Sequence, residues 1–256
     1  FPFSPRRILA AARAFNRDVI NLHNTHGAYF ATPLIAALSK MAPVVWTLHD
    51  MWSFTGNASH TFGNMSWKDM KNDAALKKIP PAIGINTGAY LLRQKKRVYG
   101  QSRLSIVTPS KWLYDLAAQS PVFSGKKIYQ VYNGVDPNIF FAGKKPESRQ
   151  KLNIEPGAPV IIFVSHFLTH KNPWKGGSDL LEILSRINKA ATRKITLLML
   201  GEGTHQDLDS FSNLNIVYTA YLQSDAAVRE CLQAADLFIY PTRADNLPNV
   251  LVESIA

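Results

Sequence analysis

The chain has 256 residues, 46% hydrophobic and 18% charged, a composition typical of globular proteins. Its length predicts one or two domains. The single cysteine, Cys231, excludes a disulfide framework within the chain and a cysteine-rich zinc site. The sequence contains no run of 18 or more apolar residues, so no membrane span is predicted.

The net charge of +11 is concentrated in the first part of the sequence. Residues 1–140 hold 17 Lys and Arg against 6 Asp and Glu, whereas residues 141–256 are balanced. Such a field attracts anionic partners, including nucleic acid, acidic lipid headgroups and phosphorylated substrates. Solubility without a specific partner explains the charge equally well at this point.

Predicted strands and helices alternate along the first half of the chain. We expect strands over 17–24, 43–50, 104–110 and 127–136, and helices over 29–41, 74–79, 89–100 and 111–120. Ser110 is a favourable N-cap for the last of these helices. A segment rich in proline, glycine and charge follows, so we place a domain boundary near residue 140.

The second half repeats this alternation. We expect strands over 159–166, 194–201, 215–222 and 236–242, and helices over 178–190, 226–235 and from about residue 247. The first of these strands is continuously apolar, which is typical of a strand buried on both faces. The pattern predicts an α/β fold with two Rossmann-like domains, 1–140 and 141–256, each built on a parallel sheet.

Polar residues cluster where the predicted strands end, and ligands of open parallel sheets bind at those ends. Four of the seven histidines lie there, namely His23, His26, His49 and His166. Lys175 comes just before a helix, where free amides, the helix dipole and an ammonium form an anion site. An exposed loop lysine is the alternative, and this stretch alone leaves both open.

The last residues place two carboxylates around the start of a helix. Pro248 suits the first helical position; Asp245 precedes it, and Asn249 and Glu253 share a face. A ligand carrying both sugar hydroxyls and phosphate fits this arrangement. A capping Asp and a solvated Glu fit it equally well on spacing alone. The Gly-x-Gly turn at 201–203 lacks a full dinucleotide fingerprint, which disfavours NAD.

Motifs along nearly the whole chain resemble a known family. "VINLHNTHGAYF", "VVWTLHDMWSFTG", "IVTPSKWLYDLA", "VYNGVDPNIF" and "RADNLPNVLVESIA" occur in order. They are similar to family-four retaining glycosyltransferases of the GT-B fold, in particular to members that build bacterial exopolysaccharides of the colanic-acid type. This resemblance implies two Rossmann-like domains facing a cleft, with the donor bound by the second and the acceptor by the first.

The resemblance also implies roles for individual residues. The catalytic residues are His49 and Asp245, both near the donor sugar, and Lys175, which neutralises the diphosphate. Asp245 stands where the family more often has Glu. Glu253 is expected to bind the ribose hydroxyls. The remaining donor-binding positions are Asn246, Leu247 and Asn249 at the sugar or phosphate, His166 beside the diphosphate, and Tyr221 and Leu222 near the base.

The expected substrate is a UDP-, GDP- or similar nucleotide sugar, with no cofactor. Relatives often carry a cysteine cluster after "HDMWSFTG"; this chain has no cysteine there, so we predict no metal. The acceptor is expected to be a glycan or a polyprenyl-diphosphate-linked glycan. The basic first half suits contact with an anionic membrane, and hence a cytoplasmic location at the inner face of the cytoplasmic membrane. We expect a fragment that lacks the family's first strands and its final elements.

Other interpretations remain open from the sequence. The chain could bind a nucleotide sugar without catalysis, or belong to another GT-B enzyme such as a nucleotide-sugar epimerase, although "NLPN" speaks against the latter. A nucleic-acid partner is not expected, because no recognised nucleic-acid-binding motif is present.

Overall fold

A computed structural model describes residues 5–26, 29–167, 174–202, 208–219 and 222–256. The chain divides into two units, Phe1–Tyr132 and Asn133–Ala256. The units therefore divide earlier than the predicted boundary near residue 140. The segment 133–144, the connector, packs on the second unit, because Arg229 Nη1 of α7 (Asp225–Ala234) donates a hydrogen bond of 3.1 Å to the Ile139 carbonyl.

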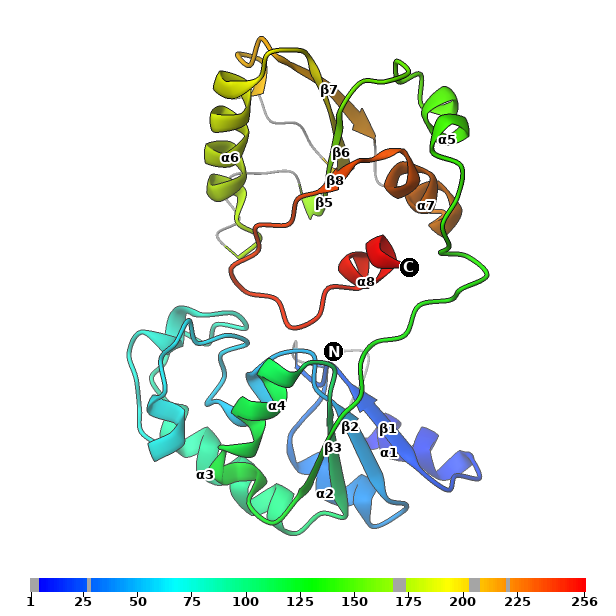
Figure 1. The fold of residues 1–256 in the computed structure, drawn as a ribbon. Helices are drawn as coiled ribbons and strands as arrows, with labels where there is room; N and C mark the ends of the chain where they lie inside the picture. Colours follow the sequence, from blue (N-terminus) through cyan, green and yellow to red (C-terminus); the bar gives the residue numbers. More distant parts are fainter. Residues whose placement is uncertain (1–4, 27–28, 168–173, 203–207, 220–221) are drawn as a thin grey trace. The chain divides into compact units, whose positions relative to one another are not determined.

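Four parallel strands form the sheet of the first unit in the order β1-β2-β3-β4 (Figure 1). They are β1 (Ile20–His23), β2 (Val44–Thr47), β3 (Leu104–Thr108) and β4 (Lys127–Gln130). The helices are α1 (Pro5–Ala14), α2 (Pro33–Ser39), α3 (Gly88–Gly100) and α4 (Lys111–Ala118), with 3-10 turns η1 (Trp52–Phe54), η2 (Ser66–Asp69), η3 (Leu76–Lys78) and η4 (Pro121–Phe123).

Aromatic side chains fill the core of the first unit. Trp46 of β2 packs edge-on against Tyr99 of α3, with ring centroids 5.6 Å apart. Phe54 and Trp67, from the turns after β2, are fully buried with them. The long segment between β2 and α3 is therefore anchored to the core although it contains no α-helix.

The second unit has a parallel sheet in the order β7-β6-β5-β8. Its strands are β5 (Val160–Phe167), β6 (Ile195–Glu202), β7 (Leu214–Thr219) and β8 (Leu237–Phe238), and its helices are α5 (Lys145–Lys151), α6 (Gly177–Ala190), α7 (Asp225–Ala234) and α8 (Asn249–Ile255). Helix α6 covers one face of this sheet, and α5 and α7 lie on the other (Figure 1). Both faces are thus apolar and covered, as predicted for a continuously apolar strand.

The predicted α/β class with two parallel sheets is confirmed. The cap at Ser110 is also confirmed, because its Oγ accepts a hydrogen bond of 3.1 Å from Leu113 N. Cys231 is buried, and burial raises the pKa of its thiol to about 11, so it is an inert core thiol.

Three local predictions are wrong. The strand expected over 236–242 pairs with β5 only at Leu237 and Phe238. The helix expected over 74–79 is the single turn η3. Helix α8 begins at Asn249, because Pro248 holds an extended conformation with ψ of 129°. This helix contributes no buried residue, and Ile255 at its end is 79% exposed.

Candidate functional site

A cluster of four polar side chains lies beyond the carboxyl ends of β5 and β8 in the second unit. Asp245 Oδ2 accepts hydrogen bonds from Lys175 Nζ at 2.6 Å, from the Tyr240 hydroxyl at 2.8 Å and from Thr242 Oγ1 at 3.1 Å. Lys175 Nζ also lies 3.3 Å from the Tyr240 oxygen. The structure therefore brings together Lys175 and Asp245, two of the three predicted catalytic residues, which are far apart in the sequence.

Main-chain bonds fix the loops that carry this cluster. The Trp174 carbonyl accepts hydrogen bonds from Arg243 N at 3.0 Å and Ala244 N at 3.1 Å. The Arg243 guanidinium in turn makes two bonds of 2.5 Å to the Asp179 carboxylate on α6. The segment before α6 is thus clamped to the segment after β8, so the position of Lys175 relative to Asp245 is set by backbone as well as by charge.

Gly176 allows the segment before α6 to approach the segment after β8 closely. Its φ of +68° lies in the left-handed region, and a Cβ added there would lie 1.8 Å from the Pro241 carbonyl oxygen. Glycine alone fits such a conformation at such a close approach. The residue that follows Lys175 therefore has to lack a side chain for Lys175 to reach Asp245.

The cluster remains open to solvent on one side. The side chains of Lys175 and Asp245 are 35% and 21% exposed, so an anionic or hydroxyl-bearing ligand can approach them. The three bonds to Asp245 all use Oδ2, and none of them uses Oδ1. Burial, and then the Asp245 charge, raise the pKa of Tyr240, which keeps its hydroxyl a hydrogen-bond donor at neutral pH.

The start of α8 is held by the connector. Asn133 Nδ2 donates to the Leu247 carbonyl at 3.2 Å and to Asn249 Oδ1 at 2.9 Å. Asn246 and Leu247 form the loop that joins the cluster to this helix. Asn249, the first residue of α8, is therefore held in place, and its Oδ1 is already hydrogen-bonded to Asn133 of the same chain.

Glu253 lies away from the four-residue cluster. It is half-buried and lines a cavity of about 330 Å³ together with Phe141, Arg229 and Gln233. Burial, and then the nearby Asp225 charge, raise the pKa of the Glu253 carboxyl. In the described part of the chain, Asp245 and Glu253 thus face different surroundings, although the sequence analysis expected one ligand to meet both.

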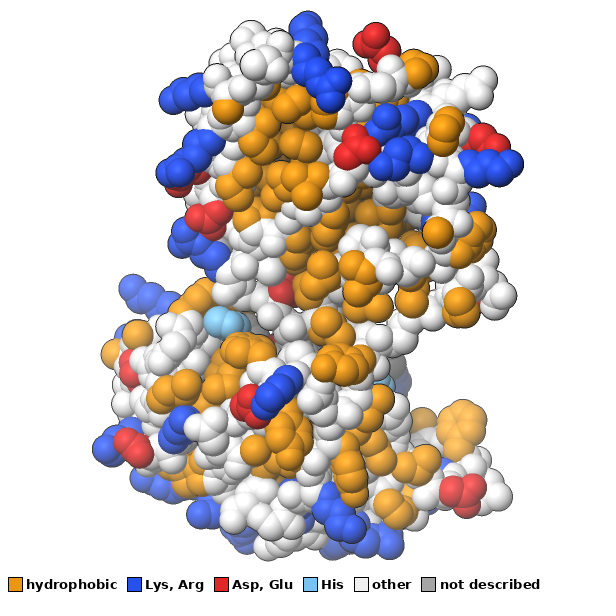
Figure 2. All heavy atoms as spheres, viewed as in Figure 1, with side chains coloured by type: hydrophobic (Ala, Val, Ile, Leu, Met, Phe, Trp, Pro, Cys, Tyr) orange, Lys and Arg blue, Asp and Glu red, His pale blue; other side chains and the backbone are white. Residues whose placement is uncertain are grey.

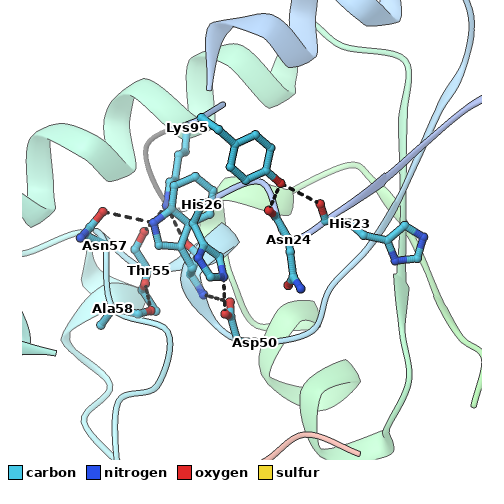
Figure 3. Close-up of polar contacts among 10 residues, drawn as sticks. His23, Asn24, His26, Asp50, Thr55, Asn57, Ala58 and Lys95 are labelled. Carbon is cyan, nitrogen blue, oxygen red and sulfur yellow. Dashed lines mark hydrogen bonds and ion pairs between the residues drawn. The ribbon is translucent and has the colours of Figure 1, made fainter. Parts of the chain in front are cut away.

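A second group of polar side chains lies at the carboxyl edge of the first sheet (Figure 3). His23 Nδ1 lies 2.8 Å from His49 Nε2, so one of these nitrogens donates a hydrogen to the other. His26 Nε2 lies 2.7 Å from Asp50 Oδ2. Burial and the neighbouring His23 lower the pKa of His49, which favours its neutral imidazole. His49 is thus placed by another histidine, which the sequence analysis noted but did not assign.

The remaining predicted donor-binding residues are only partly described. His166 lies within β5, but its side chain is outside the described part, and Tyr221 is outside the described residues. Leu222 packs against the core on the α7 face of the sheet. The roles expected for these three residues stay predictions.

Tyr240, Thr242 and Asn133 belong to the observed site, but the sequence analysis gave them no role. Tyr240 and Thr242 flank Pro241 in the segment shortly after β8, where side chains of a parallel sheet reach a ligand. Their place after the last predicted strand could have identified them from the sequence. Asn133 carried no such signal, because its partners follow more than a hundred residues later.

Within the described ranges, no group of three or more His, Cys, Asp or Glu side chains is arranged to hold a metal ion. None of the helices in these ranges has the length and apolar character needed to cross a membrane.

Comparison with solved structures shows which fold these two units form. Anabaena Alr3699/HepE, solved in complex with UDP-glucose, matches 98% of this chain and 60% of its own at a TM-score of 0.61 and 17% identity. Sucrose-phosphate synthase from Thermosynechococcus elongatus matches 98% of this chain and 57% of its own at 0.61 and 10% identity. WaaG, a glycosyltransferase of lipopolysaccharide biosynthesis, matches at 0.54 and 13% identity, covering all of this chain and 76% of its own. The fold is GT-B.

Sequence comparison then gives the family. Residues 1–139 match the model "Glycosyltransferase Family 4" and residues 158–256 match "Glycosyl transferases group 1". The chain belongs to glycosyltransferase family 4.

Two curated relatives are similar to the chain. WcaC of Escherichia coli (strain K12), provisionally named a colanic acid biosynthesis glycosyl transferase, is 24% identical over 83% of this chain and 49% of its own length. The D-inositol 3-phosphate glycosyltransferase of Segniliparus rotundus is 26% identical over 51% of this chain and 30% of its own. The chain thus spans half or less of the length of these relatives.

Gly176→Ala should destabilise the second unit more than a matched glycine substitution. A left-handed residue with a side chain costs about 1–2 kcal/mol, and the contact with the Pro241 carbonyl adds to this cost. Gly157 has φ of +81° with nothing within 4 Å of its added Cβ, so Gly157→Ala isolates the backbone cost. Urea unfolding measures both. Equal losses in the two variants would contradict the close approach at Gly176.

Proposed function

We propose that the intact protein transfers a sugar, with retention of configuration, from a nucleotide-diphosphate sugar to a glycan or lipid-linked acceptor in the synthesis of a cell-surface polysaccharide. Membership of glycosyltransferase family 4 supports the reaction class. The observation that carries the proposal is the convergence of Lys175, Tyr240 and Thr242 on the Asp245 carboxylate beyond the carboxyl ends of β5 and β8. HepE was solved in complex with UDP-glucose, and WcaC is named for colanic acid biosynthesis, which supports this donor and product class.

Lys175 would act on the leaving group. Breaking the bond between the sugar carbon and the diphosphate oxygen leaves negative charge on the diphosphate, and a fixed ammonium lowers the energy of that charge. The segment around Gly176 leads directly into α6, whose first amides add positive potential. Lys175 is only partly exposed, so less solvent screens its charge than at an open surface.

Asp245 would hold the donor sugar. Its Oδ2 is occupied by three protein donors, which fix the carboxylate while Oδ1 takes part in none of these bonds. A carboxylate oxygen held in this way accepts a sugar hydroxyl with little loss of side-chain freedom. Asn246, Leu247 and Asn249 would line the same end of the donor. No protein cofactor is part of this proposal.

Retention would follow from attack on the face that the diphosphate leaves. The new bond joins the acceptor oxygen to the sugar carbon as the bond from that carbon to the diphosphate oxygen breaks, and the proton of the acceptor hydroxyl passes to the departing diphosphate. We assign no residue of this chain as a covalent nucleophile. His49, placed by His23, is assigned to the donor sugar on the strength of the family motif. Its Nε2 is engaged with His23, so its Nδ1 would be the ring nitrogen that bonds the sugar.

Lys175→Ala should lower turnover by about a hundredfold or more, since loss of one fixed group that stabilises developing charge costs about 10²–10³ in rate. The assay supplies the intact protein with a panel of UDP- and GDP-sugars and follows released nucleoside diphosphate and the sugar product. Lys189→Ala, an exposed lysine at the end of α6, is the matched control and should keep full activity.

Full activity of Lys175→Ala would refute the role of Lys175. Release of an isomerised free sugar without transfer would identify an epimerase, and donor binding without turnover would identify a binding protein. Either result would replace the proposed function.

Glu253→Gln should weaken binding of a nucleoside diphosphate about tenfold or more, because a hydrogen bond to a charged group contributes about 1.5–3 kcal/mol. Binding of inorganic pyrophosphate, which lacks ribose, should not change. The pKa of Glu253 is raised by burial and Asp225, and protonation removes the acceptor. Nucleotide affinity should therefore fall as the pH drops through this raised pKa.

Calorimetry on the intact protein at several pH values measures both effects of Glu253. The acidic loss of affinity should be absent from Glu253→Gln and present in the surface control Glu182→Gln on α6. An equal loss for pyrophosphate would contradict the ribose assignment.

The basic first half supports a further part of the proposal, that the protein acts at an anionic membrane surface on the cytoplasmic side. Residues 1–140 carry the whole net charge of +11. On the face drawn in Figure 2, the Lys and Arg side chains of the first unit are spread among other types instead of gathering in one patch. On this face, attraction would therefore come from the summed field more than from a defined cluster of basic side chains.

Sedimentation with vesicles tests this location. The intact protein should bind vesicles that contain acidic lipid more strongly than neutral ones, and about 0.5 M salt should remove most of the difference, because exposed charges are then screened over a few ångströms. Equal binding to neutral vesicles would count against the membrane proposal and would leave the transferase proposal intact.

A further inference from the structure

A buried cation lies beneath the carboxyl edge of the first sheet. Lys95 of α3 is only 2% exposed. Its Nζ donates hydrogen bonds to three main-chain carbonyls, those of Trp52, Thr55 at 3.0 Å and Gly56 at 3.3 Å (Figure 3). The ammonium also lies 3.9 Å from the centre of the Trp52 ring. Among the described residues, no carboxylate is paired with it.

These three carbonyls belong to the loop that follows His49. In that loop, Asp50 Oδ1 accepts a hydrogen bond of 2.8 Å from Trp52 N, and Asp50 Oδ2 lies 2.7 Å from His26 Nε2. Asp50 is therefore oriented from two sides, by the loop backbone and by a histidine at the end of β1. The conformation of residues 50–56 decides where the His26–Asp50 pair lies.

Helix α3 holds this loop at three points. Besides Lys95, the Tyr99 hydroxyl one turn later donates 3.0 Å to the Ser53 carbonyl. At the start of the helix, Gly88 lies so close to Gly56 that a Cβ on Gly56 would fall 2.5 Å from the Gly88 Cα. The carbonyls at the end of the short turn η1 have no helical partners of their own, and α3 supplies those partners.

An ammonium suits this position better than any apolar side chain. Its three donors match three converging carbonyls. Each carbonyl left unpaired in the core would incur a desolvation penalty. The charge is itself costly here, because burial lowers the pKa of Lys95 to about 7, and Asp50 only partly offsets this effect. An apolar side chain would fill the same space without the desolvation cost of a charge. The lysine is therefore best explained by the loop conformation that its hydrogen bonds stabilise.

We infer that Lys95 is a positioning residue, which holds the loop 50–56 in the conformation that places the His26–Asp50 pair and His49 at the substrate edge of the first sheet. The inference rests on the proposed function for its kinetic consequence. Lys95 itself is too deeply buried to touch a substrate. The Trp52 ring lies against its ammonium, and the Asp50 charge acts on it electrostatically.

Lys95→Met in the intact protein tests this inference, because methionine keeps the length of the side chain and removes the charge and the donors. Turnover should fall at least tenfold. The affinity for nucleoside diphosphate, measured by calorimetry and assigned to the second unit, should stay within about twofold. Lys96→Met, the exposed neighbour on the same helix, is the matched control and should leave both unchanged.

Histidine NMR provides the measurement that does not depend on activity. In Lys95→Met, the ring resonances of His26 should shift, because Asp50 moves with the loop. Lys96→Met should reproduce the wild-type spectrum. A folded Lys95→Met protein with unchanged His26 resonances and unchanged turnover would overturn the inference. Loss of nucleotide binding together with turnover would also overturn it, in favour of a general role in folding.

Tyr99→Phe serves if Lys95→Met does not fold, since it removes a single bond to the same loop. It should shift His26 and lower turnover with nucleotide binding intact, and no change in His26 would overturn the inference. If the wild-type protein transfers no sugar, the proposed function fails, while the His26 resonances still decide whether Lys95 positions the loop.

Discussion

The pairing of β5 with β6 is the constraint on which the second unit depends. The two strands pair in parallel from Val160 with Thr196 to Val164 with Leu200, and helices cover both faces. A strand buried on both faces has no position along its length for an exposed functional group. Polar chemistry is therefore displaced beyond the strand ends, and Lys175 and Asp245 meet there.

Each unit contains a charged side chain that is partly or fully withdrawn from water and is satisfied by three hydrogen bonds, and the two charges have opposite signs. In the second unit a carboxylate, Asp245, collects three donors, while in the first unit an ammonium, Lys95, collects three acceptors. A polar group withdrawn from water is costly unless it is satisfied, and once it is satisfied it fixes its neighbours. In each unit the result is a rigid loop next to side chains that remain reachable.

Glycines at two close approaches add to this rigidity. Gly176 lets the segment before α6 touch the Pro241 carbonyl, and Gly56 lets the loop after β2 touch the start of α3. Both glycines lie beside the side chains assigned to function. Backbone that is fixed by close packing holds Lys175 and the His26–Asp50 pair without the loss of entropy that a mobile loop would suffer on binding a ligand.

Local sequence determined most strands, most helices and the cap at Ser110, because hydrophobic period and capping chemistry act over a few residues. The motif order indicated Lys175 and Asp245 as individual residues. The predictions that failed concern places where neighbours in space decide: the short β8, the single turn η3 and the late start of α8.

Tertiary structure alone decided the contacts. Nothing in the spacing of Lys175 and Asp245 shows that they form an ion pair, because the bond depends on the clamp between two distant loops. Lys95 stands in a run of four cations and glutamine, and only its position above Leu92 and beside Tyr99 on the buried side of α3 separates it from Lys96. The sequence determined which groups are present; packing decided which of them are withdrawn from water, and therefore which must find a partner.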